Sequence, residues 1–267
     1  ETAIGEALLP SLITFFLFQF TWREIWGGIG TCIIIVFLPL VYWLGRYLKS
    51  NNHDSSNSGL TKSNKKLIVS WNRSQVLKDL RFYQVLPGLL ASPFIVTGVF
   101  FHQIHLIETK SWSITLLASS YPFFALSVIG VTFGAGWIID RFGTVHLLRF
   151  FLLPLAFGLL LIVATDKAFA IPIFMILMGA SAGSATIVIS TLWVELYGIN
   201  YIGSIRSMFF SMVVLATSIS PALMGLLLDI GVTLEIQFII FAIYIFICSI
   251  IFAILTPNLL IARSPPS

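Results

Sequence analysis

Very few side chains within the long apolar stretches of this sequence can take part in chemistry. Thr97, His102 and Gln103 lie in one such stretch, and Tyr121 lies in the next. Hydroxyl, imidazole and amide groups can bond a solute or pass a proton, and they are costly when they face lipid. We therefore expect them to face the protein interior or a water-filled cavity, as candidate contacts to a substrate or a proton. Hydrogen bonding between helices is the alternative use.

A polar motif also interrupts the apolar pattern in the middle of the chain. It reads Gly136-Trp-Ile-Ile-Asp140-Arg141-Phe-Gly143. Glycine allows a sharp turn or a close backbone approach. A carboxylate at the start of a helix accepts free amide hydrogens and complements the helix dipole. Asp140 is therefore predicted to cap the following helix, and the motif is either a tight capped loop or the latch of a gate.

Enzyme, metal and nucleotide chemistry find little support in the sequence. A membrane enzyme would need His, Asp or Glu clustered at one interface, whereas the four His are scattered along the chain. Cys32 and Cys248 lie in apolar runs, which favours small buried side chains over a disulfide or a metal site. The chain contains no phosphate-binding glycine motif. We expect no enzyme activity, no cofactor, no metal and no energy from ATP.

The elements that must position these groups are membrane helices. The chain has 267 residues, of which 58% are hydrophobic and 10% are charged, whereas about a quarter of the residues of a soluble domain are charged. Its apolar runs are long enough to cross a bilayer as helices of roughly 20 residues. The net charge of +4 comes from basic residues gathered in one loop, so we expect a lipid bilayer, not nucleic acid, as partner. The predicted fold class is all-α, integral membrane.

We predict eight membrane-spanning helices. Their approximate ranges are 4–21, 27–47, 83–105, 114–138, 147–164, 169–193, 206–228 and 235–256. A short turn is expected over 22–26, and apolar residues at helical spacing in 71–81 predict an interfacial helix. The expected parts of the chain are two helices in 1–47, a polar linker in 48–80, six helices in 81–258 and a tail in 259–267.

Lysine and arginine are distributed unequally over the two sides of the predicted membrane. One side carries twelve of them, and the other carries only Arg23, Lys110 and Lys167. Because cytoplasmic loops carry an excess of Lys and Arg, we expect the linker, the loop after the fourth span and the C-terminus to be cytoplasmic. The membrane would be a plasma membrane or an inner membrane.

Two further glycine patterns point to helix packing and to an internal repeat. Gly179 and Gly183 form a Gly-x-x-x-Gly face in the sixth span, which predicts close packing of two helices. Gly225-x-x-x-Asp229-x-Gly231 follows the seventh span and echoes the earlier glycine–aspartate motif on the opposite side of the membrane. Two three-helix units of inverted topology would produce such an echo.

Together these features resemble the major facilitator superfamily of secondary transporters. The motif from Gly136 to Gly143 resembles the family's Gly-x-x-x-Asp-Arg-x-Gly motif between helices eight and nine, and the basic linker resembles the loop between helices six and seven. Within the superfamily, the chain resembles the monocarboxylate-porter-like branch. The other matching pieces are Trp22-Arg23, Leu196-Tyr197-Gly198, Gly203-x-Ile205-Arg206 and Ser220-Pro221 followed by Gly225, Asp229 and Gly231.

The resemblance implies both an architecture and a function. The family has twelve helices in two halves of six, so this chain would supply the last two helices of the N-terminal half and a complete C-terminal half. The implied function is a transporter that moves a small-molecule substrate by alternating access. The branch implies a small organic anion such as a monocarboxylate. Proton coupling through His102 and uncoupled movement both stay open, and a non-transporting or inactive truncated membrane protein is the alternative.

The resemblance and the charge pattern also predict a cytoplasmic gate. Exposed ion pairs contribute about 0–1 kcal/mol each, so several of them can shift conformers that differ by a few kcal/mol. We expect contacts that form only when the inward side is shut. The candidate residues are Gly136, Asp140, Arg141, Gly143, Arg149, Glu195 and Arg206.

Overall fold

A computed structural model describes residues 13, 15–17, 19–51 and 70–259 of the chain. The described residues form helices and turns, with no strand among them. Seven of their helices are long and apolar enough to cross a membrane. The all-α membrane architecture predicted from the sequence is therefore confirmed, while the predicted span 4–21 falls largely outside the described residues.

The chain divides into two compact units, and α2 (Trp22–Asn51) is the long helix of the first. A reciprocal pair of hydrogen bonds begins this helix. The backbone amide of Thr21 donates to the Glu24 carboxylate at 2.8 Å, and the amide of Glu24 donates to the Thr21 hydroxyl at 3.5 Å. This capping box satisfies two of the free amides at the helix start. The turn expected over 22–26 is instead the first turn of α2.

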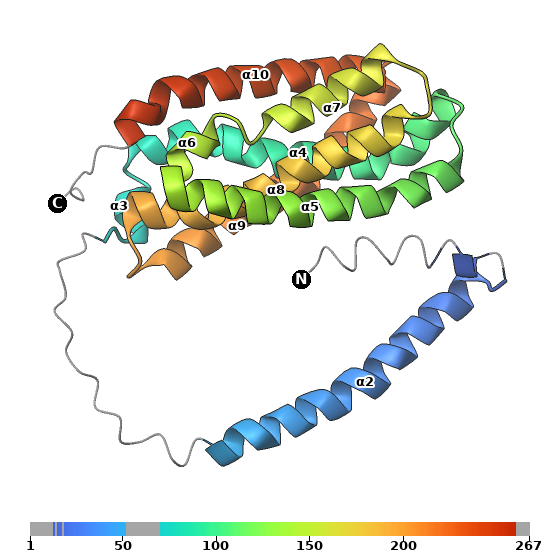
Figure 1. Ribbon diagram of the computed structural model, residues 1–267, viewed down its shortest axis with the longest axis horizontal. Helices are drawn as coiled ribbons and strands as arrows, with labels where there is room; N and C mark the ends of the chain where they lie inside the picture. The colour runs from blue at the N-terminus through green and yellow to red at the C-terminus, as the bar shows by residue number, and fades with distance from the viewer. Residues whose placement is uncertain (1–12, 14, 18, 52–69, 260–267) are drawn as a thin grey trace. The chain divides into compact units, whose positions relative to one another are not determined.

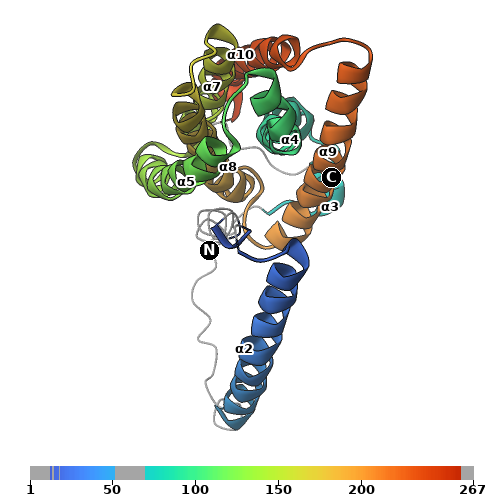
Figure 2. The same cartoon turned by 90° about the vertical axis from the view of Figure 1, so that its right-hand side faces the viewer.

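The second unit is a helical bundle (Figures 1 and 2). Its elements are α3 (Arg73–Val76), α4 (Leu80–Thr109), α5 (Ile114–Phe142), α6 (Thr144–Leu148), α7 (Leu153–Ala164), α8 (Ala170–Tyr197), α9 (Ile202–Asp229) and α10 (Leu234–Leu259). α8 packs along α5 and α7, α4 packs along α9, and α10 lies against α7. The predicted fifth span corresponds to α6 and α7, which are joined by a turn.

Close backbone packing joins α8 to α5. A methyl group added at Gly183 would lie 2.6 Å from the carbonyl oxygen of Val128, and one added at Gly179 would overlap the carbonyl oxygen of Phe124. In a bilayer no hydrophobic force drives helices together, so tight packing of small residues supplies much of the attraction. The close packing predicted from the Gly-x-x-x-Gly pattern is therefore confirmed.

A buried cluster fixes the start of α4. Asp79 caps the helix by accepting from the amide of Arg81, and its other oxygen pairs with the Arg81 guanidinium at 2.8 Å. That guanidinium lies 5.4 Å from the ring centroid of Trp71, whose amide donates to the carbonyl of Tyr197 at 3.0 Å. The interfacial helix expected over 71–81 is therefore only the single turn of α3, because the Asp79 cap starts a new helix.

The opposite end of the bundle is tied by a lysine. The Nζ atom of Lys110 lies 2.5 Å from a carboxylate oxygen of Asp166 and 2.5 Å from one of Glu235, and the lysine side chain is only 4% exposed. The two contacts join the turn after α4, the loop before α8 and the start of α10. Burial lowers the pKa of Lys110, but the two carboxylates raise it by more, so the pKa lies above its ordinary value of 10.5.

We expect Lys110→Met to lower the free energy of unfolding by about 1–2 kcal/mol, because it leaves two carboxylates side by side without a cation. The pKa of Lys110 is raised on folding, so the stabilisation is fully present below pH 10.5 and is lost as the pH rises through the folded-state pKa. Thermal unfolding should therefore show a constant difference in stability between wild type and Lys110→Met around neutral pH, and this difference should shrink in strong alkali.

Lys167→Met is the matched control for this experiment. Lys167 lies in the same loop as Asp166, is exposed, and forms no ion pair among the described residues. An equal loss of stability in both variants would contradict a specific role for Lys110.

Candidate functional site

The four polar candidates of α4 and α5 do not share one site. Nδ1 of His102 lies 2.9 Å from the carbonyl oxygen of Gly98 in its own helix. A methyl group added at Gly225 of α9 would lie 3.7 Å from Nε2 of the same imidazole. The Tyr121 hydroxyl donates to Oε1 of Gln103 at 2.6 Å. His102 therefore lies where α4 meets α9, whereas Gln103 and Tyr121 link α4 to α5.

The surroundings of Gln103 suit helix packing better than solute binding. Gln103 borders a space of only about 10 Å³, which is closed by apolar side chains of α4, α5, α7 and α8. That volume is at the lower limit for a single water molecule. Thr97 is half-buried and makes no side-chain hydrogen bond among the described residues.

The structure contradicts the prediction that Asp140 caps the next helix. α5 continues through Asp140 to Phe142, so the carboxylate lies in the last turn of α5. The cap of α6 is provided by Glu195, whose carboxylate accepts from the amide of Thr144 at 3.0 Å and from its hydroxyl at 2.6 Å. The fourth predicted span ended one turn too early, and this error placed Asp140 at the wrong end of a helix.

The glycines of the two aspartate motifs adopt similar roles. Gly143 has a φ of 82° and follows α5, and Gly231 has a φ of 88° and follows α9. Each closes a helix whose last turn holds an exposed aspartate, Asp140 or Asp229. The first glycine of each motif, at positions 136 and 225, lies within its helix. The echo in the sequence is thus matched by the local backbone, at opposite ends of the bundle.

The predicted gate residues gather at one end of the bundle but do not pair with one another. None of the five charged candidates forms an ion pair with another member among the described residues. The guanidinium of Arg141 lies 5.8 Å from the ring centroid of Trp137, and that of Arg149 lies 4.9 Å from the ring centroid of Phe150. The five are Asp140, Arg141, Arg149, Glu195 and Arg206.

A recess of about 350 Å³ opens between α4, α8 and α9, and we call it the α4–α8–α9 recess. Most of its wall is apolar. Its polar lining residues are Ser92 of α4, Thr186 and Ser190 of α8, and Arg206 of α9. The serines and the threonine were not predicted from the sequence, because small hydroxyl side chains are common wherever membrane helices pack.

Arg206 lies toward the end of this recess. One of its terminal nitrogens, Nη2, donates to the carbonyl oxygen of Ser190, while its Nε is buried without a hydrogen-bond partner in the described structure. At 1.5 Å per residue, Arg206 is about 6 Å from the start of α9, and Ala182 is about 22 Å from the end of α8. Both residues line the recess, which therefore extends from near the helix ends to the middle of the bundle.

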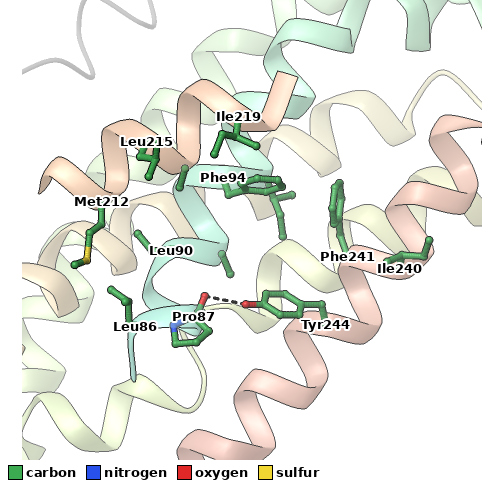
Figure 3. Close-up of a pocket in the computed structure, with 13 residues that line it drawn as sticks. Leu86, Pro87, Leu90, Phe94, Met212, Leu215, Ile219, Ile240, Phe241 and Tyr244 are labelled. Atoms are coloured by element: carbon green, nitrogen blue, oxygen red, sulfur yellow. Dashed lines mark hydrogen bonds between the residues drawn. The ribbon is translucent and has the colours of Figure 1, made fainter. Parts of the chain in front are cut away.

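A larger groove of about 550 Å³ lies between α4, α9 and α10 (Figure 3). Apolar side chains, including Phe94 and Phe241, line it almost completely. The Tyr244 hydroxyl donates to the carbonyl oxygen of Pro87 at 3.1 Å, and no charged residue is found in the wall within the described part of the chain. A charged solute finds no counter-charge there, so the smaller recess is the better candidate for a solute site.

The chain matches the model of a known protein family. The model of the Major Facilitator Superfamily matches residues 2–221, which is well over half of the chain and includes every residue that lines the α4–α8–α9 recess. No curated protein matches the chain.

Proposed function

Because the chain belongs to the major facilitator superfamily, we propose that it moves a small solute by alternating access, with the α4–α8–α9 recess as part of the path. The family consists of transporters, and the apolar helices make this chain an integral membrane protein. The observation that carries the proposal is the recess itself, which combines polar groups with an apolar wall and reaches the middle of the bundle. Secondary transporters bind their substrates at this depth.

The proposed solute is a small organic anion such as a monocarboxylate. The recess supports this choice because Arg206 is the only charged residue among the described residues that line it. Movement is either uncoupled or coupled to protons through His102. The half-buried imidazole lies between α4 and α9, so a shift of one helix against the other would change its surroundings.

We propose further that the Asp140 end of the bundle faces the cytoplasm and carries the gate. The excess of Lys and Arg in the adjoining loops supports this orientation. An aspartate in the last turn of a helix is disfavoured by the helix dipole. Asp140 has no ion-pair partner among the described residues. A compensating contact in a second conformer would account for such a residue.

Uptake by the complete protein in liposomes tests the proposed function. We expect saturable uptake of a labelled short-chain monocarboxylate above that of empty liposomes. An inward proton gradient should accelerate uptake if movement is proton-coupled and should have no effect if it is uncoupled. Folded protein that takes up neither the anion nor its neutral amide would favour the non-transporting alternative.

A further inference from the structure

We propose that Arg206 binds the charged group of an amphipathic organic anion whose apolar tail lies along the α4–α8–α9 recess toward the middle of the bundle. This inference rests on the proposed function and adds to it a recognition residue, an orientation and a shape for the solute. It also gives Arg206 a role other than the gate contact expected from the sequence.

The first argument is the charge of the recess. Arg206 lines it, and none of the other described residues in its wall is an aspartate or a glutamate. Among the described residues, Arg206 forms no ion pair with any carboxylate. A cation in a largely apolar recess is costly unless an anion pairs with it. The recess therefore provides the environment in which a negatively charged ligand gains most from binding.

The second argument is the set of hydrogen-bond donors that remains. An arginine side chain has five N–H donors in a planar fork, which fits the two oxygens of a carboxylate. In Arg206, Nη2 is held by the Ser190 carbonyl, and the buried Nε has no partner in the described structure. The Ser190 contact fixes the guanidinium. Because Nε is shielded from solvent, the donors left for a ligand are those of Nη1, which makes no hydrogen bond in the described structure.

The third argument is the shape of the wall beyond the charge. Phe210 and Val213 follow Arg206 on the same helix, and Val96 and Ala182 line the recess from the other two helices. At about 350 Å³ the recess is near the lower limit of small-molecule sites, which start at roughly 300 Å³. A carboxylate with a short hydrocarbon tail fits both the single cation and the apolar wall.

The test compares a carboxylate with its neutral isostere. Binding and uptake of butyrate and butyramide are measured with the complete protein and with its Arg206→Gln and Arg206→Lys variants. We expect Arg206→Gln to weaken butyrate binding by about tenfold to a hundredfold, as loss of a charge-assisted bidentate contact does, with little change for butyramide. Arg206→Lys should recover part of the binding, because lysine keeps the charge but not the fork.

Arg73→Gln is the matched control, because Arg73 is exposed on α3 at the same end of the bundle and does not line the recess. It should leave butyrate binding unchanged. Lengthening the tail of the carboxylate should strengthen binding by about fourfold per methylene group, until the recess is full.

Several outcomes would overturn the inference and leave the proposed function standing. One is wild-type butyrate binding by Arg206→Gln. Another is an equal loss for butyrate and butyramide, as expected if Arg206 acts only in a gate. If Arg206→Gln does not fold, the Arg206→Lys variant is tested in its place. A butyrate affinity of Arg206→Lys equal to that of wild type would contradict a bidentate contact from the guanidinium. Failure of the wild type to transport any solute would instead contradict the proposed function.

Discussion

Asp140→Asn is expected to reduce solute uptake by about fivefold or more while the folded protein stays in the membrane. Asp140 is exposed in the last turn of α5, where a negative charge opposes the helix dipole. Neutralising it should leave this conformer unchanged or slightly more stable. If Asp140 stabilises a second conformer by about 1–2 kcal/mol, the neutral side chain loses that contribution and the transport cycle slows.

Two measurements separate this prediction from a general loss of protein. The amount of folded Asp140→Asn protein should equal that of wild type, and uptake should be compared per folded molecule. Glu108→Gln is the control, because Glu108 is an exposed carboxylate at the opposite end of the bundle without an ion pair in the described structure. Full uptake by Asp140→Asn would refute the proposed gate.

The second large effect is expected at the contact between α5 and α8. Gly183→Ala should lower the free energy of unfolding by about 1–3 kcal/mol, as overpacking does. The added methyl group would lie 2.6 Å from the backbone oxygen of Val128, and backbone atoms cannot rotate away as a side chain can. Combining it with Gly179→Ala should reduce the yield of folded protein further.

The chain offers a buried reporter for this experiment. Cys248 is 5% exposed, whereas Cys32 is exposed, so in a Cys32→Ser background thiol labelling during heating follows unfolding of the bundle. Gly130→Ala is the matched control, because a methyl group at Gly130 meets no atom within 4 Å. It should be neutral or stabilising, by up to about 1 kcal/mol. Equal labelling temperatures for Gly183→Ala and Gly130→Ala would show that the close packing contributes little.

Hydropathy predicted the long helices of the bundle well, but it placed their ends poorly. Apolar runs give the position of a span because the bilayer requires about 20 such residues. The helix ends depend on individual hydrogen bonds, and a hydropathy value carries no information about those. α2 begins at the capping box of Thr21 and Glu24, and α5 runs on past Asp140 to Gly143. The family was predicted correctly because the order of several short motifs carried more information than any one of them.

The candidate site was harder to predict, because it depends on which face each side chain occupies. Adjacent residues on a helix point about 100° apart, and in this structure His102 lies against α9 whereas Gln103 lies against α5. The recess is built from α8, α9 and the distant α4, and its polar residues have no recognisable spacing in the sequence. Arg206 was predicted as a gate residue at the start of the seventh span, because its position four residues into α9 became clear only with the helix boundaries.

The ion pairs of Lys110 should couple the opening of three chain segments that would otherwise open independently. A single ammonium group holds the turn after α4, the loop before α8 and the start of α10. Local opening of a protein proceeds in cooperative units, so amide hydrogens in these three segments should exchange with solvent at a common rate.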